Sequence, residues 1–270
     1  MGVQAVERVS FKVASVGVSL FFTVFIFLAV ATLFFVPSLH EIVEALKSRE
    51  LLFSLKLSIV TSITATFFVI LLGVPIGYAL SRFDFPGKSA VKSILDLPMA
   101  FPELVLGLAL LLLFGNTVIG RWLSYVGINV VFTKLGIVVA QFFTALPFTV
   151  RVIYTTFEGI SPRYELVARS LGYSEFETFR KVTLPMARDG LFASAIISFA
   201  RSMGAFGAVL ILAGGSYMKT ETLPITLYLN LSYGNLGMAI TSGMVLVVVS
   251  FVAILIFERL EGGGHGTARG

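Results

Sequence analysis

A few ionisable side chains inside long apolar stretches are the residues of this chain that could do chemistry. Glu103 and Arg201 lie deepest in such stretches, and a charge within a membrane span is costly and is a functional candidate by default. Two interpretations stay open: Arg201 lines a path and assists an anion, or a buried Arg201–Glu103 pair holds two helices together. Cysteine is absent, and His40 and His265 lack metal-ligand spacing. We therefore predict no catalytic residue, no metal ligand and no disulfide.

The composition indicates which elements position these charges. Of the 270 residues, 57% are hydrophobic and only 13% are charged, about half the charged fraction of a soluble domain. A spanning helix needs about 20 mostly apolar residues. We expect an all-α integral membrane protein with about six transmembrane helices, over residues 13–36, 51–80, 93–114, 135–157, 190–213 and 238–257.

Prolines lie inside the second, third and fourth of these apolar runs: Pro75, the pair Pro98 and Pro102, and Pro147. A proline inside a helix kinks it, and neighbouring helices must satisfy the freed carbonyl groups. Three kinked helices favour a packed bundle around a path over a set of simple anchors. Plain bundle packing would explain each proline equally well.

The distribution of Lys and Arg between the connecting segments predicts the orientation. The side that carries the N-terminal tail holds more than twice as many basic residues as the other side, and cytoplasmic loops carry this excess in membrane proteins. We predict a multi-pass protein of the plasma membrane with both termini cytoplasmic. Because the basic residues lie in these loops, the net charge of +5 does not indicate a nucleic-acid partner.

The longest cytoplasmic connection, residues 158–189, carries two sets of helix signals. Ser161 suits an N-cap and is followed by a proline at the first helical position, while Gly172 suits the C-terminal stop. Ser174 and Glu177 then have the spacing of a capping box. The pattern predicts a short helix, a tight turn and a second short helix.

Two aromatic residues of this connection, Phe176 and Phe179, lie on one face of the second short helix. Solvent alone gives no reason for phenylalanine there. Either both side chains pack beneath the membrane domain, or they fill a groove on a cytoplasmic partner.

This loop resembles the EAA loop of bacterial and archaeal ABC importer permeases. The pattern of that loop is Glu-Ala-Ala, three residues, Gly, nine residues, Ile, one residue and Leu-Pro. In this chain nine residues separate Gly172 from the segment Val-Thr-Leu-Pro at 182–185, and Ala168 falls on the second alanine. With six spans, the resemblance covers nearly the whole chain and implies the fold of a type I ABC importer permease.

The first part of the pattern differs. Leu166 and Val167 stand where the family has Glu and Ala, and Glu165 lies one position before the expected acid. In the family this loop is the coupling helix that docks into a groove of the ATPase subunit. The residues that we assign to this coupling loop are Glu165, Ala168, Gly172, Ser174, Phe176, Glu177, Phe179, Leu184 and Pro185.

A second resemblance narrows the substrate. The segments 204–208, Gly-Ala-Phe-Gly-Ala, and 219–224, Lys-Thr-Glu-Thr-Leu-Pro, are similar to the permeases for molybdate, tungstate and sulfate. Ala205 stands where that subfamily usually has Glu. The glycines favour close helix packing over direct contact with an oxyanion. The residues that we assign to a translocation path are Glu103, Arg201, Gly204 and Gly207.

The resemblance implies a homodimer around a central path, two ATP-binding cassette ATPase subunits on the cytoplasmic face, and an external solute-binding protein. The sequence contains no Gly-x-x-x-x-Gly-Lys-Ser/Thr phosphate loop, so we expect a transport subunit, with ATP and magnesium bound by the partner ATPase. We predict one permease domain over residues 1–260 and a flexible tail over 261–270. The expected function is import of a tetrahedral oxyanion by alternating access, with molybdate or tungstate ahead of sulfate.

Other functions remain as alternatives. The importer could carry sulfate or another anion, or the chain could be a secondary transporter driven by an ion gradient. The few intramembrane acids argue against the secondary transporter, which would be expected to use buried carboxylates and broken helices in repeated halves. The chain could also be a membrane anchor or assembly subunit without a path.

Overall fold

The computed structural model of the chain describes residues 2–262, and the side chains described are those of residues 12–253, 255, 256 and 259. The predicted tail, 261–270, lies almost wholly outside this range. Every regular element within residues 2–262 is helical. Four helices are long and apolar enough to cross a bilayer: α1 (Gly2–Phe35), α3 (Arg49–Arg82), α7 (Lys134–Gly159) and α14 (Leu236–Gly262).

Two further spans are bent pairs of helices, which bring the total to six if each pair is one span. The prediction of a single kinked helix over 93–114 was wrong. The chain instead forms α4 (Lys88–Asp96), a single 3₁₀ turn η1 (Leu97–Met99) and α5 (Glu103–Asn116), with a bend of 112°. Prolines at 98 and 102 supply no backbone N–H, and the residue before each proline is disfavoured in the α conformation. Together they explain a sharp break at this point.

The second bent pair consists of α11 (Arg188–Gly204) and α12 (Gly207–Ala213), which meet at 59°. The predicted fifth span, 190–213, is therefore also broken. Ala205 and Phe206 connect the two helices, and Ala205 has extended backbone dihedrals. The backbone amide groups at the start of α12 are thus free to donate hydrogen bonds to an acceptor from another element.

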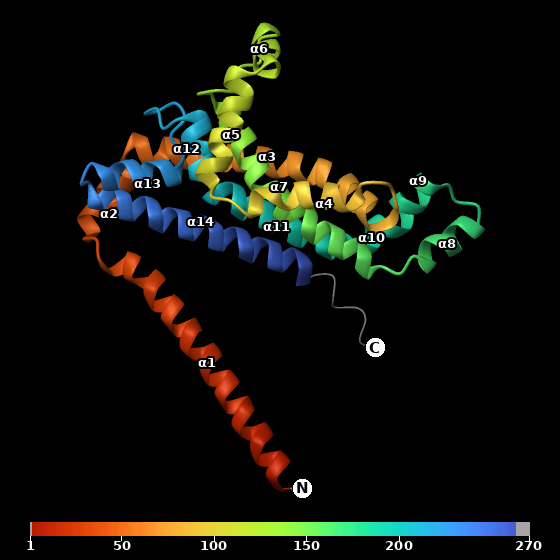
Figure 1. Cartoon of the computed structure of the whole chain (residues 1–270). Helices are drawn as coiled ribbons and strands as arrows, with labels where there is room; N and C mark the ends of the chain where they lie inside the picture. Colours follow the sequence, from red (N-terminus) through yellow and green to blue (C-terminus); the bar gives the residue numbers. More distant parts are fainter. Residues whose placement is uncertain (1, 263–270) are drawn as a thin grey trace.

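Helices α3 and α7 stay continuous through their prolines, Pro75 and Pro147, and pack side by side (Figure 1). Gly77 makes this approach possible. A Cβ atom added there would lie 2.6 Å from Ile153 Cγ2 and 3.1 Å from the backbone nitrogen of Tyr154. The helices run in the same direction, so both begin at the same end of the helical body.

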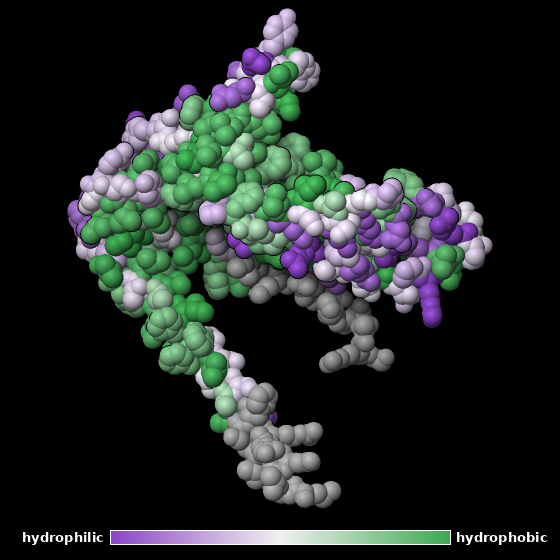
Figure 2. All heavy atoms as spheres, in the orientation of Figure 1, coloured by the Kyte–Doolittle hydropathy of each residue, from purple (hydrophilic) through white to green (hydrophobic). Residues whose placement is uncertain are grey.

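Helix α1 extends away from the other helices (Figure 1). None of its described side chains is buried, and most are apolar, as the green surface of its upper half shows (Figure 2). A helix that is apolar all round needs a nonaqueous environment. The bilayer or another polypeptide must supply that environment.

Helices α2 (Leu39–Lys47) and α13 (Leu223–Ser232) lie at the end of the body at which α3 and α7 begin, whereas α6 (Val118–Tyr125) contacts α5 and projects from the body (Figure 1). A capping box between Ser38 and Glu41 opens α2, and α2 and α13 pack against α14. Apolar side chains of α5, α7 and α12 form the largest buried cluster, with Ile137, Val209 and Leu212 at its centre.

Candidate functional site

The predicted coupling loop forms the polar end of the molecule, where hydrophilic residues gather (Figure 2). It contains α8 (Arg163–Ser170), a turn at Gly172, and α9 (Glu175–Thr178), which continues through a π-helical turn η2 (Phe179–Thr183) into α10 (Leu184–Met186). The helix–turn–helix prediction is confirmed. Gly172 has φ +92°, a conformation that glycine adopts without a Cβ penalty. The first helix begins one residue later than expected, with Pro162 as its N-cap.

The predicted capping box of α9 is present. The Ser174 hydroxyl accepts from the Glu177 amide, and the Glu177 carboxylate accepts from the Ser174 amide at 3.1 Å. This amide hydrogen bond and the neighbouring Lys181 lower the pKa of Glu177. Arg169 pairs with Glu175 at 3.2 Å across the turn. The loop therefore has its own local structure and presents a defined surface.

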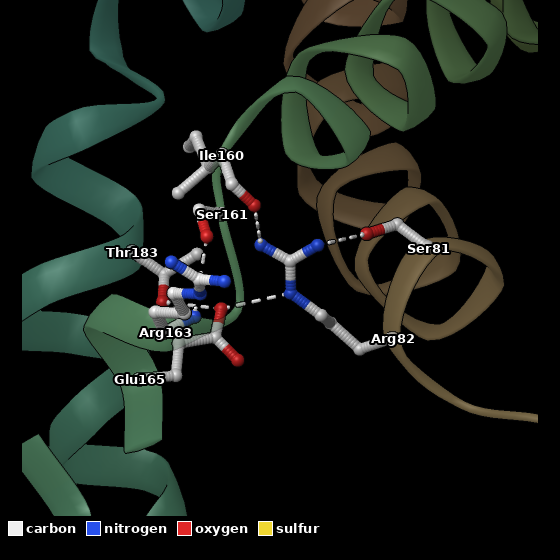
Figure 3. Close-up of polar contacts among 7 residues, drawn as sticks. All are labelled: Ser81, Arg82, Ile160, Ser161, Arg163, Glu165 and Thr183. Carbon is white, nitrogen blue, oxygen red and sulfur yellow. Dashed lines mark hydrogen bonds and ion pairs between the residues drawn. The ribbon is translucent and has the colours of Figure 1, made fainter. Parts of the chain in front are cut away.

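Glu165 is the acid that anchors this loop to the membrane-spanning body (Figure 3). Its Oε1 accepts from Nε of Arg82 at 2.9 Å and from the hydroxyl of Thr183 at 2.8 Å. Arg82 also donates to the carbonyl of Ile160 at 2.8 Å and to the hydroxyl of Ser81 at 3.0 Å. One guanidinium thus joins the C-terminal end of α3 to both the start of the loop and α8.

This ion pair is well shielded, because the side chains of Arg82 and Glu165 are 8% and 14% exposed. Arg82 was not predicted as a site residue. Its position as the last residue of α3 was the available signal, since a cation stabilises a helix C-terminus. Nothing local indicated Glu165 as its partner, which is distant in the sequence.

Phe176 and Phe179 have different surroundings, so the interpretation that both side chains pack beneath the membrane domain holds only for Phe179. Phe179 packs beneath the membrane-spanning helices, with its ring centroid 4.7 Å from that of Tyr78 and 6.3 Å from that of Phe157. Phe176 is 70% exposed. Both line a groove of about 730 Å³ between α8, α9 and the C-terminal end of α3.

The other residues assigned to the coupling loop also include both buried and exposed side chains. Ala168 is buried under α8, and Leu184 is half-buried. Pro185 is exposed, as is Leu166 at the position of the family's acid. The coupling loop thus packs small or apolar residues against the membrane-spanning helices and keeps an apolar outer surface.

The predicted pair between Arg201 and Glu103 is not formed, so that interpretation was wrong. The carboxylate of Glu103 instead accepts from the backbone amides of Phe206 and Gly207, each at 3.1 Å. Glu103 therefore caps the free N-terminus of α12, where an anion is favoured by both the amides and the helix dipole.

Arg201 lies on the exposed side of α11, and its guanidinium stacks on the ring of Phe148 at 3.8 Å. Gly204 lies one turn further along α11, and a Cβ there would meet nothing within 4 Å. Gly207 differs, because a Cβ would lie 3.0 Å from the backbone nitrogen of Leu104. Gly207 thus serves close packing, whereas Arg201 and Gly204 face outward from the single chain.

No group of three or more His, Cys, Asp or Glu side chains that could hold a metal ion occurs among the residues that the structure describes. The described features of the site are the exposed coupling loop at one end and the outward-facing Arg201 in the span. Both suit a protein that works by contact with other chains.

Comparison with known proteins decides the family. The family described as "Binding-protein-dependent transport system inner membrane component" matches residues 70–263. This chain belongs to that family. Its members are transport components, so the chain is grouped with membrane permeases and not with enzymes.

Curated members of the family align over most of this permease. The sulfate transport system permease protein CysT of Escherichia coli is 33% identical over 81% of this chain and 79% of its own length. The molybdate/tungstate transport system permease protein WtpB of Methanocaldococcus jannaschii is 33% identical over 88% and 96%. The sulfate permease CysW of Synechocystis is 32% identical over 93% and 92%.

Solved structures show the same fold. A chain of a bacterial ABC transporter that imports the acidic polysaccharide alginate matches with a TM-score of 0.75 at 16% identity, over 97% of this chain and 98% of that one. A chain of the MetNI methionine ABC transporter matches with a TM-score of 0.61 at 19% identity, over 79% and 95%. The permease therefore has the type I ABC importer fold predicted from its sequence.

Proposed function

We propose that this permease is the membrane-spanning subunit of an ATP-driven importer for a tetrahedral oxyanion, molybdate or tungstate. The WtpB relative and the similar segments at 204–208 and 219–224 support this substrate. Sulfate is the second candidate, because CysT is equally identical to this chain. A single permease domain over residues 1–260 carries the function.

The observation that carries the proposal is the exposed apolar surface of the coupling loop. Phe176 projects from a capped helix at the polar end of the molecule, and Leu166, Val167 and Leu171 are also exposed there. Aromatic anchors of this kind bind pockets on a partner. We assign the partner as an ATP-binding cassette ATPase, with one copy for each permease, which binds the ATP and magnesium that this chain has no phosphate loop to hold.

Two copies of the chain form the path in this proposal, with both termini cytoplasmic and a solute-binding protein on the outer face. Arg201 and Gly204 face outward from one copy, so a second copy would enclose them. The Arg201 cation, held on Phe148, then assists the anion. When ATP draws the ATPases together, the loop moves with them, and the Arg82–Glu165 pair transmits that movement to α3.

The test is oxyanion uptake in proteoliposomes that contain the permease, its ATPase and its binding protein. Phe176→Ala removes the exposed anchor without touching Phe179. We expect ATPase affinity and ATP-dependent uptake to fall about 30-fold, the effect of losing one interface hot spot. Phe67→Ala is the matched control, since Phe67 is exposed on the membrane-spanning part of α3. Unchanged uptake in the Phe176 variant would contradict the docking assignment.

The same vesicles test the substrate and the path. Competition between radiolabelled molybdate, tungstate and sulfate names the oxyanion, and Arg201→Gln should raise its KM while leaving ATPase binding intact. An unchanged KM would remove Arg201 from the path. Uptake that follows an ion gradient without ATP would overturn the importer. Mass spectrometry of the intact assembly and its subunits shows whether two copies are present or whether a different permease pairs with this one.

A further inference from the structure

A groove of about 440 Å³ runs between the first halves of α3 and α7, at the end of the molecule opposite the coupling loop. Its walls are almost entirely apolar and come from both helices. They comprise Phe53, Leu57, Val60, Leu135 and Val138, with Thr61 and Thr64. None of the importer functions proposed above uses this groove.

Two lysines border it, Lys56 of α3 and Lys134 of α7. Both are exposed, and neither forms an ion pair with any side chain that the structure describes. The ammonium group of Lys134 lies 5.7 Å from the centre of the Phe53 ring. Two cations from different helices therefore meet at one apolar groove.

The two lysines lie at a similar depth along the membrane-spanning helices. At 1.5 Å per residue, the rise is about 39 Å from Lys56 to Arg82 along α3 and about 38 Å from Lys134 to Gly159 along α7. The hydrocarbon core of a bilayer is about 30 Å thick, and the bilayer with its headgroups about 40–45 Å. Both ammonium groups thus reach headgroup level in the leaflet opposite the coupling loop, while the apolar walls lie at the depth of the acyl chains.

We propose that Lys56 and Lys134 bind the phosphate of an anionic phospholipid whose acyl chain fills the groove between α3 and α7. A cationic pair above an apolar wall matches the two parts of such a lipid. A free oxyanion would gain nothing from the apolar walls. Helix α1 of a second copy would fill the groove but offers no acid between residues 13 and 36 to meet the lysines.

Native mass spectrometry of the full chain, released from micelles that contain phosphatidylglycerol and phosphatidylcholine, measures the binding. Each basic residue near a membrane surface changes the affinity for anionic lipid about fivefold. The double variant Lys56→Gln/Lys134→Gln should therefore bind phosphatidylglycerol about 30-fold more weakly, with phosphatidylcholine unaffected. The control Lys47→Gln/Lys219→Gln removes two exposed lysines that do not line the groove and should bind normally.

A second variant separates the groove from the charges. Val60→Trp fills the groove, keeps both lysines, and should also weaken phosphatidylglycerol binding. Normal binding by this variant, or displacement of the lipid by millimolar inorganic phosphate, would overturn the proposal, because the lysines would then be a general anion surface.

The chain contains no cysteine, so disulfide cross-linking can test the other candidate occupant of the groove, α1 of a second copy. Cysteines introduced by Val60→Cys and Phe25→Cys should form no disulfide between two copies if lipid occupies the groove. Rapid formation of that disulfide, without retained phosphatidylglycerol, would assign the groove to α1 of a second copy and would overturn the lipid assignment.

Discussion

The two ends of the helical body give a shielded carboxylate opposite surroundings. At the coupling-loop end, Glu165 is paired with Arg82 and also accepts from Thr183. At the other end, Glu221 lies between α12 and α13, is 2% exposed, and faces the carboxylate of Glu50. Its Oε2 has no hydrogen-bond partner among the described protein atoms.

This difference separates a charged anchor from a carboxyl group that favours its proton. Burial, and then the charge of Glu50, raise the pKa of Glu221. Glu165 has a cation within hydrogen-bond distance, so its charge contributes to the attachment of the coupling loop. The comparison predicts that removing the cationic partner of Glu165 destabilises the protein most, and that removing the charge of Glu221 stabilises it.

The largest effect is expected for Arg82→Gln, which leaves the shielded carboxylate of Glu165 without its cation. Breaking a buried pair costs about 3–5 kcal/mol, so the melting temperature in detergent should fall by about 6 °C or more. The double variant Arg82→Gln/Glu165→Gln should recover part of this loss. Lys88→Gln breaks an ion pair whose acid is fully exposed and serves as the control. Equal melting temperatures for Arg82→Gln and the unaltered protein would show that the pair does not anchor the loop.

A smaller effect is expected for Glu103→Ala, because this acid is satisfied by backbone amides and not by a cation. Loss of an N-terminal cap costs about 1 kcal/mol, so the melting temperature should fall by about 2–4 °C. Glu103→Gln keeps an acceptor oxygen and should lose less. Glu44→Ala, which removes an exposed acid of α2, should have no effect. A loss as large as that of Arg82→Gln would mean that Glu103 has a second role.

The smallest effect, with the opposite sign, is expected for Glu221→Gln. Since the folded protein raises the pKa of Glu221, it binds the proton more tightly than the unfolded chain does. The resulting stability is fully present below the unfolded pKa and is lost as the pH rises through the folded pKa. Glu221→Gln should therefore raise the melting temperature at pH 8 and leave it unchanged near pH 4. A lower melting temperature at pH 8 would indicate that the charged form is stabilised by a cation.

Much of the fold could be predicted because its signals are local. Long apolar runs identified the spans, and the spacing of Ser174 and Glu177 identified a helix start that the structure contains. Gly172 marked a turn with positive φ. The break at residues 100–102 was missed, because a proline inside a run is compatible with both a continuous helix and a sharp bend. Pro75 and Pro147 show the first outcome, and the α4–α5 junction shows the second.

By itself, the sequence determined the membrane class, the six apolar spans and the helices of the coupling loop, because periodicity, hydropathy and capping depend on residues close together in the chain. Only the tertiary structure decided which residues contact one another. It joined Glu165 to Arg82, assigned Glu103 to the α12 amides, and separated half-buried Phe179 from exposed Phe176. Such contacts depend on how distant helices are placed against one another, and one sequence carries no local signal for that placement.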